Sequence, residues 1–197
     1  PEAVRGRSDG GVIMKGIFFC EFLEMVEDTF SPALADAIIA DSALAADGAY
    51  TAGGLYDYRE LLRLVDRLSA QTGIGDEELM VRFGNHLFPV LADRYPEFFR
   101  GGATAFQFLS AIEDHIHAEV LKIYPDSEMA TFETRQSDPA TLLMTYSSRR
   151  PFGALALGLM QGCCRYFGED VEIEKEDLSA GGVTRLRFTL QRRDPLD

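Results

Sequence analysis

Two groups of residues in the sequence could carry chemistry, and the first is a pair of histidines on a predicted helix. His115 and His117 lie two positions apart, so on an α-helix their side chains point about 200° away from each other and cannot bind one metal ion together. His117 lies on the same side as the apolar Phe106 and Val120, whereas His115 shares its face with polar residues. His117 is therefore the candidate for a buried neutral imidazole, whose partner is either an ordinary hydrogen-bonding group or a metal ion.

The second group is a polar row at the end of a predicted strand. Tyr146, Ser148 and Arg150 are spaced by two, and residues at this spacing project from one face of a strand. A phenol, a hydroxyl and a guanidinium would hold one or two carboxylates through charge-assisted hydrogen bonds, although the row also fits an ordinary solvated strand. An imidazole with such a clamp, in a chain rich in Phe and Leu, is what haem needs, because haem offers iron to a histidine and two propionates to the clamp.

The elements that must position these residues follow from the spacing of apolar residues. A period near 3.6 predicts helices, and short runs of β-branched and aromatic residues predict strands. The expected helices cover about residues 18–30, 33–46, 57–72, 76–91, 105–122 and 151–167, the last with Pro151 in its first turn. The expected strands cover about residues 131–136, 141–148, 170–176 and 183–191, and residues 48–54 form a loop. Helices followed mostly by adjacent strands indicate an α+β fold.

Capping and breaking residues mark several of these boundaries. Asp57 followed by Glu60 is a capping box at the start of a helix, and Gly73 supplies its stop. Residues 124–126, Tyr-Pro-Asp, end the helix that carries the histidines. Residues 1–13 are polar and Gly-rich, so we expect a linker, a tag remnant or a disordered start, followed by a single domain over residues 14–197.

Charge and composition exclude several classes of protein. The sequence has 19 Lys and Arg against 32 Asp and Glu, a net charge of −13, which argues against partners such as nucleic acid or an anionic membrane. No apolar run reaches the ~18 residues that span a bilayer. Cys20, Cys163 and Cys164 are too few for a disulfide framework, so we expect a cytoplasmic protein with buried structural thiols. A redox switch through Cys163 and Cys164 is the weaker alternative.

The sequence resembles the haem nitric oxide/oxygen binding (H-NOX) family, which includes bacterial stand-alone sensors and the haem domain of soluble guanylate cyclase. The resemblance rests on Met14-Lys15-Gly16, on the segment from His115 to Lys122 and on Tyr146-x-Ser148-x-Arg150, and it extends to about Leu190. It implies that His117 is the proximal ligand of the iron in haem b (iron protoporphyrin IX) and that Tyr146, Ser148 and Arg150 hold the propionates. The implied fold is an N-terminal helical subdomain and a C-terminal subdomain of helices with a four-stranded antiparallel sheet, with the haem buried between them.

The same resemblance assigns the side of the haem that binds gas. The family typically carries there a Tyr that donates a hydrogen bond to bound oxygen, and that position falls on Leu155. The other residues expected to face the gas are also apolar: Phe18, Phe22, Leu87 and Leu159. Oxygen left without a donor would lose about 1–3 kcal/mol, whereas nitric oxide binds ferrous iron strongly without one. The resemblance therefore implies an NO sensor that excludes oxygen, unless Tyr50, Tyr56 or Tyr58 enters the pocket from a loop.

Ala130 is a departure from the family pattern. Family members usually carry at this position a Pro that presses on the porphyrin and distorts it, so the smaller Ala130 should let the haem flatten. In addition, the last hairpin, residues 178–190, contains none of the Cys and His residues that some bacterial relatives use to bind zinc. Because a zinc site needs about four ligands, no zinc site is expected.

The function implied by the resemblance is that of a sensory haem protein without catalysis of its own. NO, with CO as another possible ligand, would weaken or break the bond to His117 and let the helix over residues 105–122 shift. A separate protein partner would respond to the shift, and in this family that partner is a histidine kinase or a cyclic-di-GMP enzyme. Two alternatives stay open: a haem protein that binds oxygen or CO, and a haem-free interaction module whose clamp binds a partner's carboxylates.

Overall fold

The computed structural model describes residues 13–45, 47–99, 104–123 and 128–193. The chain divides into unit 1, residues 1–68 and 124–128, and unit 2, residues 69–123 and 129–197. The predicted start over residues 1–12 and the predicted helix stop at residues 124–126 lie outside the described residues, whereas Ile13 belongs to a strand. The α+β prediction with a four-stranded antiparallel sheet is confirmed.

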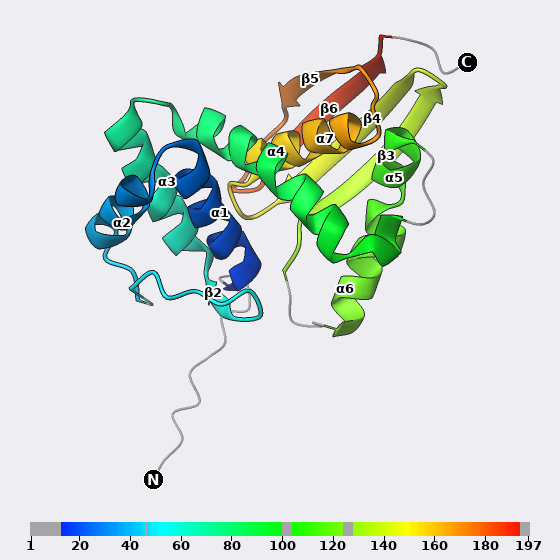
Figure 1. Cartoon of the computed structure of the whole chain (residues 1–197). Helices are drawn as coiled ribbons and strands as arrows, with labels where there is room; N and C mark the ends of the chain where they lie inside the picture. The colour runs from blue at the N-terminus through cyan, green and yellow to red at the C-terminus, as the bar shows by residue number, and fades with distance from the viewer. Residues whose placement is uncertain (1–12, 46, 100–103, 124–127, 194–197) are drawn as a thin grey trace. The chain divides into compact units, whose positions relative to one another are not determined.

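Unit 1 is mainly helical (Figure 1). It contains α1 (Gly16–Thr29), α2 (Pro32–Asp41) and most of α3 (Tyr58–Thr72). Ser31 caps α2, because its side chain accepts the Leu34 N–H at 3.2 Å, and this satisfies one of the donors that a helix leaves free at its start. The side chains that fill the core come from all three helices, among them Phe19, Phe22, Ile38, Leu61 and Leu64.

A two-stranded antiparallel sheet in unit 1 was not predicted. It pairs β1 (Ile13–Lys15) with β2 (Leu55–Asp57), and Met14 lies opposite Tyr56. A strand of three residues is too short to show an alternating pattern, so the sequence carried no signal for it.

The start of α3 agrees only in part with the predicted capping box. Asp57 caps the helix as expected, since its Oδ1 accepts the Arg59 N–H at 2.9 Å. Glu60, however, is buried and accepts a hydrogen bond from the Tyr50 hydroxyl at 2.7 Å. The end of α3 is as predicted: Gly73 follows the last helical residue with φ of 73°, a conformation that glycine adopts without a Cβ clash.

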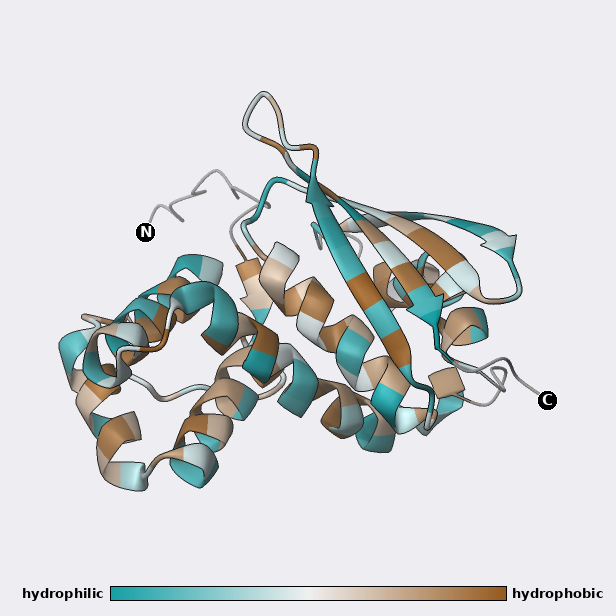
Figure 2. Ribbon diagram, turned by 90° about the horizontal axis from the view of Figure 1, so that it is seen from above, coloured by the Kyte–Doolittle hydropathy of each residue, from teal (hydrophilic) through white to brown (hydrophobic). Residues whose placement is uncertain are grey.

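The sheet of unit 2 has the strand order β3-β4-β6-β5, and all neighbouring strands are antiparallel. Its strands are β3 (Thr131–Asp138), β4 (Thr141–Ser148), β5 (Val171–Asp177) and β6 (Thr184–Arg192), each within two residues of its predicted bounds. Along the central strands β4 and β6 alternate residues face the core, and Figure 2 shows hydrophobic and hydrophilic residues alternating along strands of this sheet. The buried members on β4 and β6 are Leu142, Met144, Tyr146, Leu186, Phe188 and Leu190.

Two helices cross on the sheet of unit 2, α4 (Asp76–Arg94) and α7 (Gly153–Tyr166) (Figure 1). Glycines bring their backbones into direct contact. A Cβ on Gly84 would lie 2.5 Å from the Leu155 carbonyl oxygen and 2.6 Å from the Leu159 nitrogen, and one on Gly158 would overlap the Val81 carbonyl oxygen. Backbones can approach this closely only where no side chain intervenes.

The predicted start of α7 at Pro151 was wrong. Pro151 lies in a bend, and the Phe152 N–H donates to the Arg150 carbonyl at 2.9 Å. This tight turn delays the helix to Gly153, because the chain must reverse direction at the end of β4 before it can form helical hydrogen bonds.

The segment that carries the histidines is not one α-helix, as predicted, but three helical pieces. α5 (Ala105–Ser110) is followed by the π-helix η2 (Ile112–His117) and then by α6 (Ala118–Ile123). Thr104 caps α5 by accepting the Gln107 N–H at 3.2 Å. An apolar period of 3.6 residues in the sequence cannot reveal a local π turn, because contacts with the rest of the protein decide where the helix accommodates an extra residue.

Two remaining findings concern helices. The 3-10 helix η1 (Pro96–Phe99) follows α4. Within the part of the chain that the structure describes, no helix combines the length and the apolar character needed to cross a membrane.

Candidate functional site

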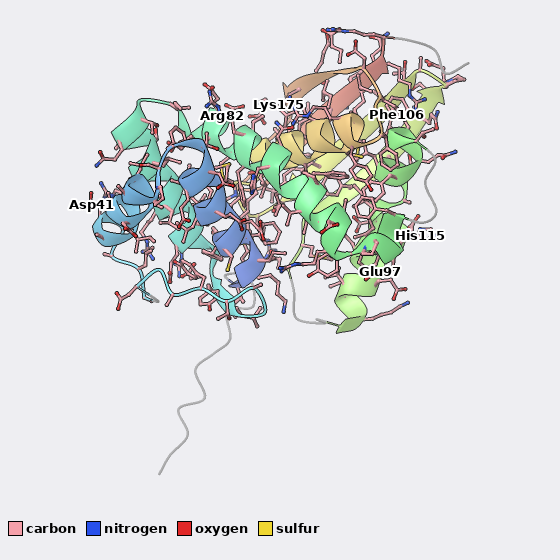
Figure 3. The ribbon with its side chains drawn as sticks, in the orientation of Figure 1. Asp41, Arg82, Glu97, Phe106, His115 and Lys175 are labelled. Carbon is pink, nitrogen blue, oxygen red and sulfur yellow. The ribbon has the colours of Figure 1, made fainter. Side chains whose placement is uncertain are left out.

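The π-helix η2 places His117 beside a carboxylate. Nδ1 of His117 lies 3.2 Å from Oε2 of Glu113, and the same Oε2 accepts the backbone N–H of Phe132 at 2.9 Å. Glu113 therefore connects the imidazole with the start of β3. Of the two histidines, His115 is exposed and lies at the surface in Figure 3, while His117 is the less exposed, with 18% of its side chain accessible.

The His117 imidazole is neutral at neutral pH. Burial lowers its pKa below the usual value of 6.5, and this outweighs the negative charge and hydrogen bond of Glu113, which raise the pKa. A carboxylate at Nδ1 accepts a hydrogen bond, so the proton lies on Nδ1 and the lone pair on Nε2. A neutral imidazole with a free Nε2 lone pair is the form that binds a metal ion.

The predicted polar row is assembled at the end of β4. Tyr146 is buried on the core face of the strand, and Ser148 is the last strand residue. Arg150 lies in the bend beyond the strand and not on the strand itself, yet it stays beside Ser148, since its N–H donates to Ser148 Oγ at 3.0 Å. The Arg150 residue is only 7% exposed, so its positive charge is largely removed from water.

The Tyr146 hydroxyl is held in its protonated form. Burial raises its pKa, against the smaller lowering effects of hydrogen bonds with Ser148 and the Phe152 backbone and of the Arg150 charge. A protonated phenol can donate a hydrogen bond. Tyr146, Ser148 and Arg150 together form a set of donors with a net positive charge, and such a set suits a carboxylate.

Phe132 connects the two halves of the site, and no pattern in the sequence selected it. Its ring centroid lies 5.7 Å from that of His117 and 5.5 Å from that of Tyr146. Phe132 and Tyr146 are also direct partners in the β3–β4 ladder. Glu113 was missed as well, although its position four residues before His117 is the spacing at which helical side chains meet.

Three of the apolar residues assigned to the gas-binding side belong to the crossing of α4 and α7. Leu87 and Leu155 are buried, and Leu159 is partly buried against the core of unit 2. The Gly84 contact described above joins α4 to the backbone of Leu155 and Leu159. Ala130 is also partly buried against this core, two residues before Phe132.

Phe18 and Phe22 lie on α1, in unit 1. Phe22 is fully buried and Phe18 is partly exposed. The hydroxyl groups of two tyrosines of the same unit already have partners. That of Tyr50 donates to Glu60 at 2.7 Å, and that of Tyr56 accepts the Thr51 N–H at 2.9 Å.

The cysteines form no disulfide: Cys163 and Cys164 are buried and Cys20 is partly exposed. Burial raises the pKa of Cys163 far above its usual value and that of Cys164 to about 12. Both thiols are therefore protonated and unreactive at neutral pH. Among the described residues, no three His, Cys, Asp or Glu side chains come together to hold a metal ion.

Known proteins show the same fold. The family described as Haem-NO-binding matches residues 15–175. The chain is 38% identical to the Fe(II) unliganded H-NOX protein from K. algicida, with 93% of this chain and 99% of that one covered and a TM-score of 0.86. A mutant of the T. tengcongensis H-NOX is 21% identical, with 93% and 100% covered and a TM-score of 0.84, and indicates the fold alone.

An oxygen complex of an oxygen-binding H-NOX domain related to soluble guanylate cyclases also indicates the fold alone. It is 20% identical, with 93% of this chain and 97% of that one covered and a TM-score of 0.79. No curated protein matches the chain.

Proposed function

Since this chain belongs to the haem-NO-binding (H-NOX) family, we propose that it is a haem-based sensor that binds NO at ferrous iron and excludes oxygen. It would signal to a separate protein and catalyse no reaction itself. The observation that carries the proposal is the contact of His117 Nδ1 with Glu113, which leaves Nε2 of a largely buried imidazole to bind a metal ion.

His117 would be the protein ligand of the iron. Its Nε2 lone pair is available because Nδ1 faces the Glu113 carboxylate. Most histidines that bind a metal through one ring nitrogen are oriented in this way, by a hydrogen bond from the other nitrogen to a carboxylate, a carbonyl or water. A single imidazole suits an iron whose other ligands come from a cofactor. Haem b supplies four porphyrin nitrogens and a ferrous iron that binds diatomic gases.

Tyr146, Ser148 and Arg150 would hold the propionates. Their hydroxyls and guanidinium suit two carboxylates, and a propionate beside the buried Arg150 would offset the cost of removing its charge from water. Leu87, Leu155 and Leu159 would provide apolar contact on the gas-binding side, to which the family pattern also assigns Phe18 and Phe22. Ala130 would leave more space at the haem than a Pro would.

Exclusion of oxygen is supported by the lack of a donor among these five residues: each has only carbon atoms in its side chain. The Tyr50 hydroxyl is occupied by Glu60, and the Tyr56 hydroxyl by Thr51. The absent hydrogen bond would cost oxygen about 1–3 kcal/mol, about a five- to 150-fold loss of affinity, while NO does not depend on it.

Signalling would begin at His117. His117 is the last residue of the π-helix η2, and the next residue begins α6. Release of His117 from the iron would therefore free the π-helical segment and the helix that follows it. We propose that a cytoplasmic histidine kinase or cyclic-di-GMP enzyme responds to this change. The net charge of −13 favours a basic docking surface on that partner, so binding should weaken as salt concentration rises.

The test is the visible absorption spectrum of the reduced protein before NO, after NO and in air, for the wild type and for His117→Gly. We expect a five-coordinate ferrous spectrum, loss of the histidine ligand after NO and no oxygen-dependent change. In His117→Gly the starting spectrum should be lost and should return with added imidazole.

Two results would replace the proposal by another function. A stable spectrum with oxygen in air would favour an oxygen-binding haem protein. A colourless protein that takes up no haem on reconstitution would leave the haem-free interaction module.

A further inference from the structure

We propose that Glu113 is a positioning residue that strengthens the bond between His117 and the iron and couples that bond to β3. The inference rests on the proposed function, because it requires His117 to bind haem. It goes beyond that function by assigning a role to a residue that contacts neither the gas nor the propionate clamp.

The geometry that carries the inference is the sharing of one oxygen. Oε2 of Glu113 lies 3.2 Å from Nδ1 of His117 and 2.9 Å from the backbone nitrogen of Phe132. The acceptor therefore binds a side chain of η2 and the main chain of β3 at once. A movement of His117 away from its position must either stretch the first hydrogen bond or pull on the second.

The position of Phe132 fixes Glu113 in turn. Phe132 is paired with Tyr146 across β3 and β4, and its ring contacts both His117 and Tyr146. Glu113 itself is 40% exposed, so burial alone does not hold its side chain in place. The Phe132 N–H supplies the second contact that keeps the carboxylate directed at the imidazole.

The chemical consequence concerns the donor strength of Nε2. A carboxylate that accepts the Nδ1 proton draws that proton toward itself and leaves more electron density on the ring, which makes Nε2 a stronger ligand. An amide accepts the same hydrogen bond without a negative charge, and such a bond is weaker. Glu113→Gln therefore removes the charge while keeping the size of the side chain and an oxygen for Phe132.

The experiment compares wild type, Glu113→Gln and Glu119→Gln in the ferrous haem-bound state. Glu119 is the matched control, since it lies two residues beyond His117 and is paired with Lys122 at the surface. The two measurements are the iron–histidine stretching frequency by resonance Raman spectroscopy and the rate of haem transfer to an excess of an apo-acceptor protein. For Glu113→Gln we expect a lower frequency and haem loss faster by about tenfold or more, and for Glu119→Gln neither change.

The outcomes separate this inference from the proposed function. If wild type shows no iron–histidine band, or a band that His117→Gly leaves in place, the proposed function itself fails. If that band depends on His117 but Glu113→Gln leaves its frequency at the wild-type value, the inference alone is overturned. Should Glu113→Gln fold poorly by circular dichroism, Glu113→Ala, which removes both hydrogen bonds, must lower the frequency in whatever fraction binds haem, and an unchanged frequency there also refutes the inference.

Discussion

Glu169 and Arg192 form an ion pair inside unit 2, with 2.7 Å between Oε2 and Nε and side chains that are only 7% and 6% exposed. The other carboxylate oxygen accepts the N–H of Ala105, the first residue of α5, at 2.7 Å. Nη1 of Arg192 donates to the Pro139 carbonyl at 2.8 Å, and the guanidinium lies 3.9 Å from the centre of the Phe106 ring. The pair thus attaches the beginning of the histidine-bearing segment to β6.

We predict that Arg192→Met lowers the free energy of unfolding by about 3–5 kcal/mol, because Glu169 would remain buried without its partner. The matched control is Arg187→Met on the same strand. Arg187 pairs with Glu176 at 3.0 Å, but both side chains are about half exposed, so its loss should cost about 0–1 kcal/mol. Urea unfolding followed by circular dichroism measures both variants, and equal losses would contradict the prediction.

The crossing of α4 and α7 gives a second prediction. Gly158→Ala would place a methyl group against the Val81 carbonyl and 2.9 Å from the Gly84 Cα. Backbone atoms cannot yield as a flexible side chain does, so we expect a loss of about 1–3 kcal/mol in unfolding free energy. Gly53→Ala, where nothing lies within 4 Å of the new Cβ, should leave the stability unchanged, and a similar loss in both variants would rule out the steric explanation.

Oxygen selectivity can be tested by adding the missing donor. Leu155→Tyr would place a phenol on α7 at a buried position, and under the proposed function it should convert an oxygen-insensitive ferrous spectrum into one that changes reversibly in air. Leu155→Phe is the control, since it adds the ring without the hydroxyl. Oxygen binding by both variants would show that pocket size, and not a hydrogen bond, excludes oxygen in the wild type.

Cysteine reactivity provides a pH-dependent prediction. Only the thiolate reacts with an alkylating agent, and the pKa of Cys164 is raised to about 12 by burial, while the pKa of Cys163 is raised further. Raising the pH from about 7 to about 9 should therefore leave both residues unmodified in the folded protein, and any label should be on Cys20. Mass spectrometry after iodoacetamide treatment measures this, with urea-unfolded protein as the control in which all three cysteines react. Rapid labelling of Cys163 or Cys164 in the folded state would contradict the prediction and support the alternative of a redox switch through these two cysteines.

Much of the fold could be predicted from the sequence because most of the elements are long and amphipathic. The central strands of the unit 2 sheet, β4 and β6, alternate between core and surface along their length, and that pattern is visible without knowledge of the partner strands. The three-residue strands β1 and β2 were missed because their pairing depends on a contact between distant parts of the chain.

The candidate site could be predicted from the sequence where its residues follow the spacing of a strand or a helix. Tyr146 and Ser148 share a strand face, and His117 is the less exposed of the two neighbouring histidines. The contact between Glu113 and the Phe132 N–H could not be found in this way, because there the carboxylate meets a main-chain group of another element. Glu60 illustrates the same limit within unit 1: its spacing from Asp57 fits a capping box, but the Tyr50 hydroxyl binds it.

The π-helix η2 also makes the direction of the imidazole depend on the number of residues that precede it. A helix with a π turn holds one residue more than an α-helix along the same path, and here Thr104 and Glu169 hold the start of that path. Removing one residue such as Asp114, which is exposed, would allow α5 and α6 to join as a continuous α-helix. Side chains beyond the deletion would keep nearly their present direction relative to α5, because the path is unchanged. His117 would, however, follow Glu113 by three residues instead of four, so the imidazole would meet that carboxylate at a different angle. For this segment, chain length is therefore as much a part of the binding site as the identity of its residues.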